Sequence, residues 1–440
     1  MLRRVLRHLA TATLTATALV AVPTPAAQAD NPVTPGDFQG HGFDQCVAPN
    51  QKAMDAWMQN SPFSAVGIYI SGASRGCRSQ PNLTPTWVST QLRKGWRLLP
   101  ITLGPQASCH PSFPRYGNDP TIDPRRGTHG NYSLARAQAR AEAETAVQVA
   151  AGLGIVKGST LWYDLEGFDH TRTDCRESAL AFLSAWTVKI RQLGYVSGVY
   201  SSAGSGLKAL DDARVLRPTK YVMPDQIWIA RWDGVANTST SYLREDGWRP
   251  GGRMKQYRGD HRETWGGITI DIDSNWLDLG RGLYAAPESH CDGTRVDFAS
   301  YARLQAGTTR AAMTKALQCL LSERGFYAGR IHGYYGPAVV RAVNRWKSSI
   351  AQPADGVVSS ADWQRLHARG TTVVLKTGST GVVVRRAQRS LNAAGAGLTV
   401  SGVYDAPTRS AVLDYQRAVG MKATGIVTWG TWQRLKAGRR

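Results

Sequence analysis

Between residues 41 and about 282, short apolar runs alternate with helical stretches, and this alternation constrains the fold more than any other feature. Eight runs predict strands, at residues 42–44, 65–70, 97–103, 161–166, 196–201, 226–232, 254–257 and 268–273. Helical spacing of apolar residues lies between most of them, clearest at 134–153 and 179–193. Eight such units predict a parallel α/β sheet closed into a TIM-like (β/α)8 barrel, whose sites lie at the carboxyl ends of the strands.

Acidic residues stand at several of those strand ends. Asp44 ends the first predicted strand, Asp164 and Glu166 end the fourth, and Asp271 and Asp273 end the eighth. Side chains alternate along a strand, so Asp164 and Glu166 share one face. A solvated or salt-bridged pair is the alternative for an isolated Asp-x-Glu. Because several acids at one barrel mouth would repel each other, we favour a functional site with separated carboxyl pKa values, as glycosidic cleavage needs.

The N-terminus predicts export. Arg3, Arg4 and Arg7 precede an apolar stretch at 9–22, and the small residues at 27–29 allow cleavage, so residues 1–29 read as a secretory signal. A twin-arginine signal is the alternative export route. We expect no membrane span after cleavage. The oligomeric state stays open.

Six cysteines follow the signal, which in an exported protein predicts disulfides. Fifteen pairings are possible, and we predict the sequential one: Cys46–Cys77, Cys109–Cys175 and Cys291–Cys319. The long polar segment 105–132 would then form a wall of the cleft, tied to Cys175. Since no two cysteines have C-x-x-C spacing, we expect neither a metal nor another cofactor.

The formal net charge is +21, and residues 301–440 hold 21 Lys and Arg against 5 Asp and Glu. This excess predicts an anionic partner, which outside the cell means wall polymers or lipid headgroups before nucleic acid. A solubilising surface is the alternative. Nucleic-acid binding would rest on charge alone, because the sequence carries no reader motif.

A set of motifs arrives in order along the barrel region: Gly42-Phe43-Asp44, Trp162-Tyr163-Asp164-Leu165-Glu166, Gly198-Val199-Tyr200-Ser201-Ser202, Ile227-Trp228-Ile229-Ala230-Arg231-Trp232, Gln256-Tyr257 and Ile272-Asp273-Ser274-Asn275. Together they resemble the glycoside-hydrolase-like domain of unknown function in exported bacterial wall proteins, a relative of the family-25 lysozymes. The resemblance covers roughly residues 38–284.

The resemblance implies a role for each acid. Glu166 would be the proton donor, and Asp164 the anion that stabilises an oxocarbenium-like transition state or orients an assisting group. Asp44 and Asp273 would surround the reacting sugar. Asp271 has no counterpart in the lysozyme motif. The lysozymes have a serine where this chain has Cys46, which remodels the subsite beside Asp44, and fold likeness does not establish turnover.

Further side chains could contact sugar, and core packing is the alternative for each aromatic. These candidates are Tyr69, Tyr200, Trp228, Trp232, Gln256 and Tyr257.

The chain after Cys291 contains an internal repeat with a spacing of about 69 residues. Trp363-Gln364-Arg365-Leu366 returns as Trp432-Gln433-Arg434-Leu435. Each copy predicts a small all-α module of three helices, and resembles the bacterial peptidoglycan-binding module. That resemblance makes Tyr335 and Tyr404, near the Gly-x-Tyr turns, the expected wall contacts, with local packing as the alternative.

The predicted domains are a barrel at 38–284 and two modules at 288–370 and 375–438. Joined to an acid-rimmed barrel, two wall-binding modules predict a secreted, wall-associated glycoside hydrolase that cleaves peptidoglycan glycan strands in the manner of a muramidase. Its partners would be peptidoglycan and anionic wall polymers. The alternative is a non-catalytic protein whose barrel binds a wall glycan.

Overall fold

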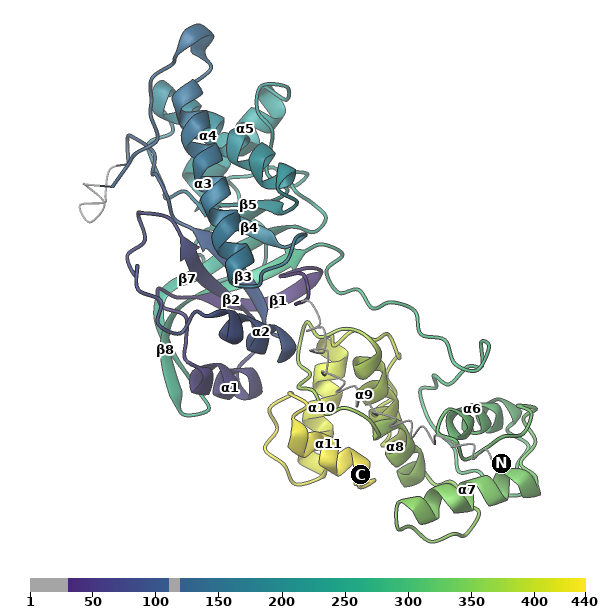
Figure 1. The fold of residues 1–440 in the computed structure, drawn as a ribbon. Helices are drawn as coiled ribbons and strands as arrows, with labels where there is room; N and C mark the ends of the chain where they lie inside the picture. The colour runs from purple at the N-terminus through teal and green to yellow at the C-terminus, as the bar shows by residue number, and fades with distance from the viewer. Residues whose placement is uncertain (1–30, 111–118) are drawn as a thin grey trace, which may run out of the picture. The chain divides into compact units, whose positions relative to one another are not determined.

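A computed structural model describes residues 31–110 and 119–440 of the chain (Figure 1). The expected signal segment and residues 111–118 of the expected cleft wall lie outside the described residues. Eight strands close into a barrel in the order β1 to β8. Their bounds are Phe38–Asp44 (β1), Phe63–Ser71 (β2), Arg97–Thr102 (β3), Thr160–Asp164 (β4), Val196–Ser202 (β5), Gln226–Ala230 (β6), Gly252–Trp265 (β7) and Ile268–Leu279 (β8).

The direction of the last strand corrects the all-parallel prediction. Strands β1 to β7 pair with their neighbours in parallel, whereas β8 runs antiparallel to both β7 and β1. The cause is local. Gly266 and Gly267 have φ of +59° and +77°, a conformation that turns the chain straight back into a hairpin with no helical crossover. The barrel is therefore a mixed eight-stranded one.

Five α-helices follow the first five strands in turn. Figure 1 shows α3 and α4 side by side on the outside of the barrel. On α3, five fully buried alanines recur at helical spacing and bring the helix close to its neighbours. The bounds are Gln51–Asn60 (α1), Pro85–Arg93 (α2), Ser133–Gly152 (α3), Thr173–Gln192 (α4) and Lys208–Leu216 (α5), with a short 3-10 turn at Thr128–Gly130 and a π-helical turn, η3, at Ala203–Leu207.

Apolar side chains fill the interior of the barrel away from its mouth, so the polar site forms only at the mouth. Trp162 of β4 and Trp228 of β6 meet edge to face with ring centroids 5.7 Å apart, and both are buried. Gly198 on β5 makes room for this pair, because a Cβ there would lie 2.4 Å from the Trp162 ring. A solid floor of this kind makes the barrel a platform for a site at its mouth and leaves no pore.

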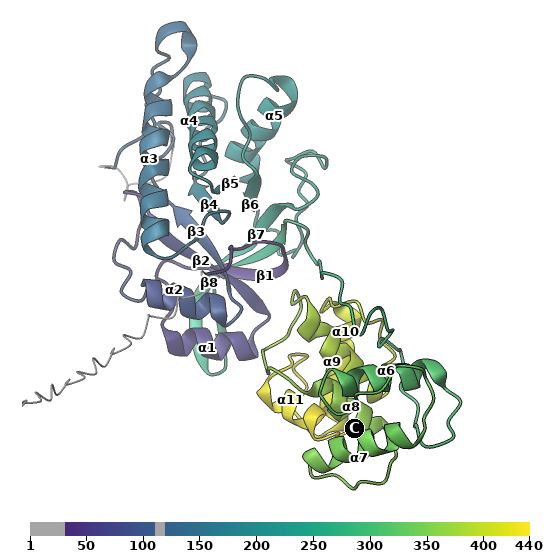
Figure 2. The same cartoon turned by 45° about the vertical axis from the view of Figure 1, so that its right-hand side comes forward.

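The C-terminal region is all-helical, as predicted (Figure 2). The repeat is visible in its packing: Trp363 and Trp432 are both fully buried, and their indole N–H groups donate to the carbonyls of Ala302 and Val373. The helices are Ala311–Ser322 (α6), Pro337–Ser349 (α7), Ser360–Ala368 (α8), Val382–Ala393 (α9), Ala406–Ala418 (α10) and Trp429–Lys436 (α11).

Candidate functional site

A cleft of about 530 Å³ opens at the mouth of the barrel, and we call it the acid cleft. It draws on the ends of β1 to β6 and on the β7–β8 hairpin. Its lining is Asp44, Gln45, Cys46, Tyr69, Arg75, Gly76, Cys77, Leu103, Glu166, Tyr200, Trp232, Gln256, Asp260, Asp271, Ile272 and Asp273.

Two of the expected acids face each other across neighbouring strands. Asp44 of β1 is the register partner of Asp273 of β8. The antiparallel direction of β8 puts Asp273 and Asp271 at the mouth, because Asp271 precedes the part of β8 that pairs with β1 and Asp273 is the first residue of that part. The sequence prediction placed these acids at the mouth correctly, although it assumed a parallel eighth strand. Gly67 permits the arrangement, because a Cβ there would lie 2.5 Å from that of Asp44.

The pKa values of Asp44 and Asp273 are both raised. Burial and the charge of Asp273 raise the pKa of Asp44 well above its usual value, although hydrogen bonds from Asn275 and Gln256 oppose the shift. Burial also raises the pKa of Asp273 to about 6, against the lowering effect of the Asp260 backbone N–H, which donates to Asp273 Oδ1 at 2.7 Å. Like charges held in one partly desolvated site favour keeping a proton there near neutral pH.

Gln256 connects the acids to the aromatic side of the cleft. Its Oε1 accepts from the Tyr200 hydroxyl at 3.0 Å and from the Trp232 indole N–H at 2.8 Å. Indole nitrogen can only donate, so Oε1 must face Trp232 and Nε2 must face the acids. Nε2 donates to Asp273 Oδ2 at 3.0 Å and lies 3.3 Å from both Asp44 oxygens. Gln256, which we predicted to contact sugar, is thus buried and hydrogen-bonds to the acids and to the aromatic side chains of the site.

The Asp-x-Glu pair divides between the cleft and the layer beneath it. Glu166 lines the acid cleft, whereas Asp164 is 2% exposed and does not. The charge of Asp164 still reaches the site, since it contributes, after burial, to raising the pKa of Tyr69.

The backbone around Glu166 is fastened on both sides. Gln106 accepts from the Glu166 N–H at 2.9 Å and donates to the Asp164 carbonyl at 3.0 Å. Downstream, the Ser205 hydroxyl in η3 accepts from the Phe168 N–H and donates to the Phe168 carbonyl, both at 2.8 Å. These bonds hold the loop that carries Glu166 in one position.

The predicted aromatic contacts separate into two groups. Tyr69, Tyr200 and Trp232 line the acid cleft, and Trp232 is 57% exposed. Trp228 is 1% exposed and donates to Asn275 Oδ1 at 2.8 Å, so it belongs to the barrel interior. Tyr257 does not line the cleft and lies near the His41 ring.

A second hollow of about 400 Å³ shares Glu166, Tyr200 and Trp232 with the acid cleft. We call it the aromatic lobe. Its far side holds Tyr242, which is 41% exposed, with the Arg231 guanidinium 5.3 Å from the ring centroid. Glu166 therefore lines both the acid cleft and the aromatic lobe.

The disulfides follow the predicted sequential pairing. Cys46–Cys77 borders the acid cleft and joins the chain after β1 to the loop after β2. Cys109–Cys175 ties the described part of the loop after β3 to the start of α4.

In the modules, the two tyrosines expected to meet wall polymer are inside. Tyr335 and Tyr404 are 1% and 0% exposed, and their hydroxyls donate to the equivalent carbonyls of Gly356 and Gly425 at 2.8 and 2.9 Å. The structure gives both side chains a packing role and brings neither to the surface.

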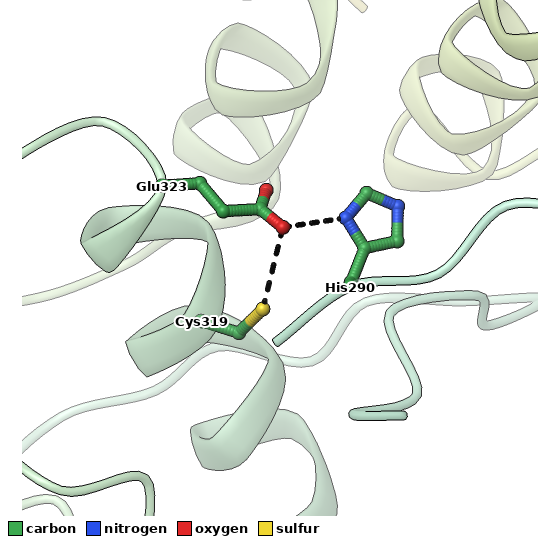
Figure 3. Close-up of side chains that lie close together, drawn as sticks. All are labelled: His290, Cys319 and Glu323. Carbon is green, nitrogen blue, oxygen red and sulfur yellow. Dashed lines mark hydrogen bonds and ion pairs between the residues drawn. The ribbon is translucent and has the colours of Figure 1, made fainter. Parts of the chain in front are cut away.

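One group of potential metal ligands occurs among the described residues, in the first module (Figure 3). His290 Nδ1 lies 2.8 Å from Glu323 Oε1, and the Cys319 sulfur is 3.7 Å from the same oxygen. Because that sulfur is bonded to Cys291, it is not available as a thiolate. The disulfide and the His290–Glu323 ion pair account for the grouping, and we assign no ion to it.

Several residues of the site had no assigned role in the sequence analysis. Asn275 donates to Asp44 Oδ1 at 2.6 Å, and it stands in a motif that was recognised. Asp260 adopts a left-handed φ of 42° at an irregularity in β7, which no pattern foretells. Gln106 and Arg75 lie in loops without periodicity, and Ser205 lies in the short π-helical turn η3.

Within the described residues, no helix combines the length and apolar character that a membrane span requires. Comparison with known families matches residues 55–277 to the family described as "Rv2525c-like, glycoside hydrolase-like domain". Residues 310–366 and 380–435 each match the peptidoglycan binding domain family. No curated protein matches the chain.

Several solved structures are similar to this chain over about half of its length, at low identity. The Mycobacterium tuberculosis Tat-secreted protein Rv2525c, in complex with L-tartrate, is 11% identical, with a TM-score of 0.36 over 55% of this chain and 97% of its own. An uncharacterised Bacillus stearothermophilus protein is 18% identical, with a TM-score of 0.34 over 54% of this chain and 95% of its own. The Clostridium perfringens spore cortex lytic enzyme SleM is 15% identical, with a TM-score of 0.36 over 54% and 67%.

The first family match spans just over half of the sequence. It includes β2 to β7 together with Glu166 and Asp273 of the acid cleft, whereas β1 with Asp44 precedes it. The chain belongs to the Rv2525c-like glycoside hydrolase-like family and carries two peptidoglycan-binding domains after its barrel.

Proposed function

We propose that this protein is an exported glycoside hydrolase that cleaves the glycan strands of peptidoglycan, with Glu166 as the proton donor. The observation that carries the proposal is the position of Glu166, a carboxyl at the junction of the acid cleft and the aromatic lobe. A sugar chain lying along both hollows would place one glycosidic oxygen beside it. The peptidoglycan-binding domains and the disulfides support a location outside the cell at the wall.

The division of labour among the acids follows from their surroundings. Glycosidic cleavage needs one carboxyl to protonate the leaving oxygen and an anion to stabilise the oxocarbenium-like transition state. Asp273, with a pKa of about 6, is mostly ionised at neutral pH, and it lines the cleft. We assign it the stabilising role, next to Asp44, whose pKa is raised well above its usual value by burial and by the charge of Asp273. Asp164, expected in that role, acts from beneath the cleft.

One observation favours a second function, glycan binding without cleavage. Of the expected Asp-x-Glu pair, Glu166 alone lines the cleft, while Asp44 and Asp273 are held by amide groups of Gln256 and Asn275. A site with its acids engaged in this way could hold a sugar and leave its bonds intact.

The two functions separate in one experiment. Purified mature protein is incubated with wall sacculi, and pelleting and newly formed reducing ends are both measured. Hydrolysis predicts reducing ends from the native protein and from a Glu144→Gln control, whose glutamate pairs with Lys189 on the outside of the barrel. Glu166→Gln should pellet normally and release none. If native protein pellets but all three proteins leave the glycan intact, binding is the function.

A further inference from the structure

The acid cleft contains a cation that the proposed chemistry does not use. Among the described residues that line it are five acids and a single basic side chain, Arg75. A cleft this acidic would repel any anionic group on a substrate. An arginine in the cleft makes the electrostatic potential around it positive, so that an anionic group is attracted there.

The loop that carries Arg75 is rigidly held. Gly72 has φ of +100°, and a Cβ there would lie 2.1 Å from the Leu103 carbonyl oxygen, so only glycine fits. The Ser74 N–H donates to that same carbonyl at 2.9 Å. Two residues after Arg75, Cys77 is bonded to Cys46 at the end of β1. The loop is thus tied to β3 on one side and to β1 on the other.

The guanidinium itself is oriented but not neutralised. Nε donates to the Gly72 carbonyl at 2.9 Å and Nη1 to the Tyr69 carbonyl at 3.2 Å. The ion pairs of the described residues include none to Arg75, and Nη2 takes part in none of their hydrogen bonds. Burial and the nearby charge of Arg78 lower the pKa of Arg75, with no carboxylate opposing the shift. The Nη1–Nη2 edge is the geometry that binds a carboxylate through two hydrogen bonds.

We infer that Arg75 binds a carboxylate carried by the glycan, so that the acid cleft selects acidic over neutral sugar chains. The inference rests on the proposed function and names the substrate class of the same site. Two sources of such a carboxylate exist in peptidoglycan: the lactyl group of a muramic acid without its peptide, and the free carboxyls of an attached peptide stem.

The test measures binding of soluble oligosaccharides to the mature Glu166→Gln protein by calorimetry, which avoids turnover. Four probes are compared: neutral chitotetraose, peptide-free peptidoglycan oligomers with lactyl carboxylates, peptide-bearing oligomers, and the peptide-bearing oligomers with their carboxyls amidated. The expected result is at least tenfold tighter binding of one or both carboxylate probes than of chitotetraose and the amidated oligomer. The better of the two carboxylate probes identifies the source.

Arg75→Gln should remove this preference and leave chitotetraose binding unchanged, and Arg75→Lys should restore part of it. Arg78→Gln is the matched control, because Arg78 is exposed and pairs with Asp119 away from the cleft. Equal weakening of all four probes by Arg75→Gln would mean that Arg75 only shapes its loop, and would overturn the inference. The inference would also be overturned if the protein with native Arg75 bound the free and the amidated oligomers equally.

The inference and the proposed function can fail separately. If native protein prefers carboxylate probes through Arg75 but cuts no glycan, the inference stands and hydrolysis fails. If it cuts glycan with no such preference, hydrolysis stands and the inference fails.

Discussion

Asp44 and Asp273 are register partners on β1 and β8, and the Nε2 atom of Gln256 is within 3.3 Å of both carboxylates. This relationship makes the two acids one titrating unit. The protonation of this pair is also coupled to Tyr200 and Trp232, because both donate hydrogen bonds to the Oε1 atom of Gln256. A sugar that displaces Trp232 would therefore disturb the acids as well.

Replacing Gln256 by glutamate should raise the pKa values of Asp44 and Asp273. The change keeps the size of the side chain, but it substitutes a third carboxyl for the Nε2 donor that stabilises the two anions. We expect the titration of the pair, followed by carbon NMR of labelled aspartate, to move upward by about one pH unit or more. Gln45→Glu adds the same charge at the cleft rim outside this network. Coincident titrations in Gln256→Glu and native protein would refute the shared unit.

Stability should fall as pH rises through the titration range of Asp273. Its folded pKa of about 6 lies above the usual aspartate value of 3.8. The folded state therefore binds more protons between these pH values, and the free energy of unfolding decreases as pH rises. The loss is complete above pH 6 and amounts to at most about 3 kcal/mol. Denaturant unfolding at several pH values from 4 to 7 measures this slope. It should be shallower in Asp273→Asn, and an unchanged slope would contradict the assignment.

Gln106 should act as a positioning residue for Glu166. In Gln106→Leu the volume is similar, but the bonds to the Glu166 N–H and the Asp164 carbonyl are lost. Because a small displacement of an acid is costly, we expect kcat on peptidoglycan to fall about tenfold to a hundredfold with KM little changed. Gln138→Leu is the control, since Gln138 bonds the neighbouring loop at Asp123 and Thr121. A rise in KM at unchanged kcat would indicate a role in binding instead.

Tyr335→Phe and Tyr404→Phe should weaken the modules without affecting wall binding. Each change removes a hydroxyl that donates to a buried glycine carbonyl. We expect each to lower the free energy of unfolding by about 1 to 2 kcal/mol, measured by denaturant titration. Co-sedimentation with sacculi should match that of native protein. Weaker sedimentation with unchanged stability would restore the tyrosines as wall contacts.

The sequence predicted the barrel and the meeting of its acids, because both depend on strand periodicity. It did not predict the direction of β8, since a two-glycine turn in place of a helix is a local event inside an otherwise regular alternation. The mouth still receives Asp273, because a hairpin places the start of β8 where a parallel strand would have placed its end.

The roles of residues in loops could not be predicted from the sequence for a different reason. Gln106 and Arg75 matter because of the backbone carbonyls and N–H groups they meet, which only the folded chain brings near. Tyr335 and Tyr404 show the opposite case: the resemblance to the peptidoglycan-binding module made them expected wall contacts, but both rings are buried in the cores of the modules.

The central claim is that Glu166 cleaves glycan, and the most direct measurement identifies the sugar at each new chain end. Sacculi treated with native protein are reduced with borohydride, hydrolysed and analysed by mass spectrometry, beside a Glu166→Gln digest. The account predicts reduced muramic acid in the native digest and background amounts in the variant. Equal amounts of reduced sugar in the two digests would contradict it.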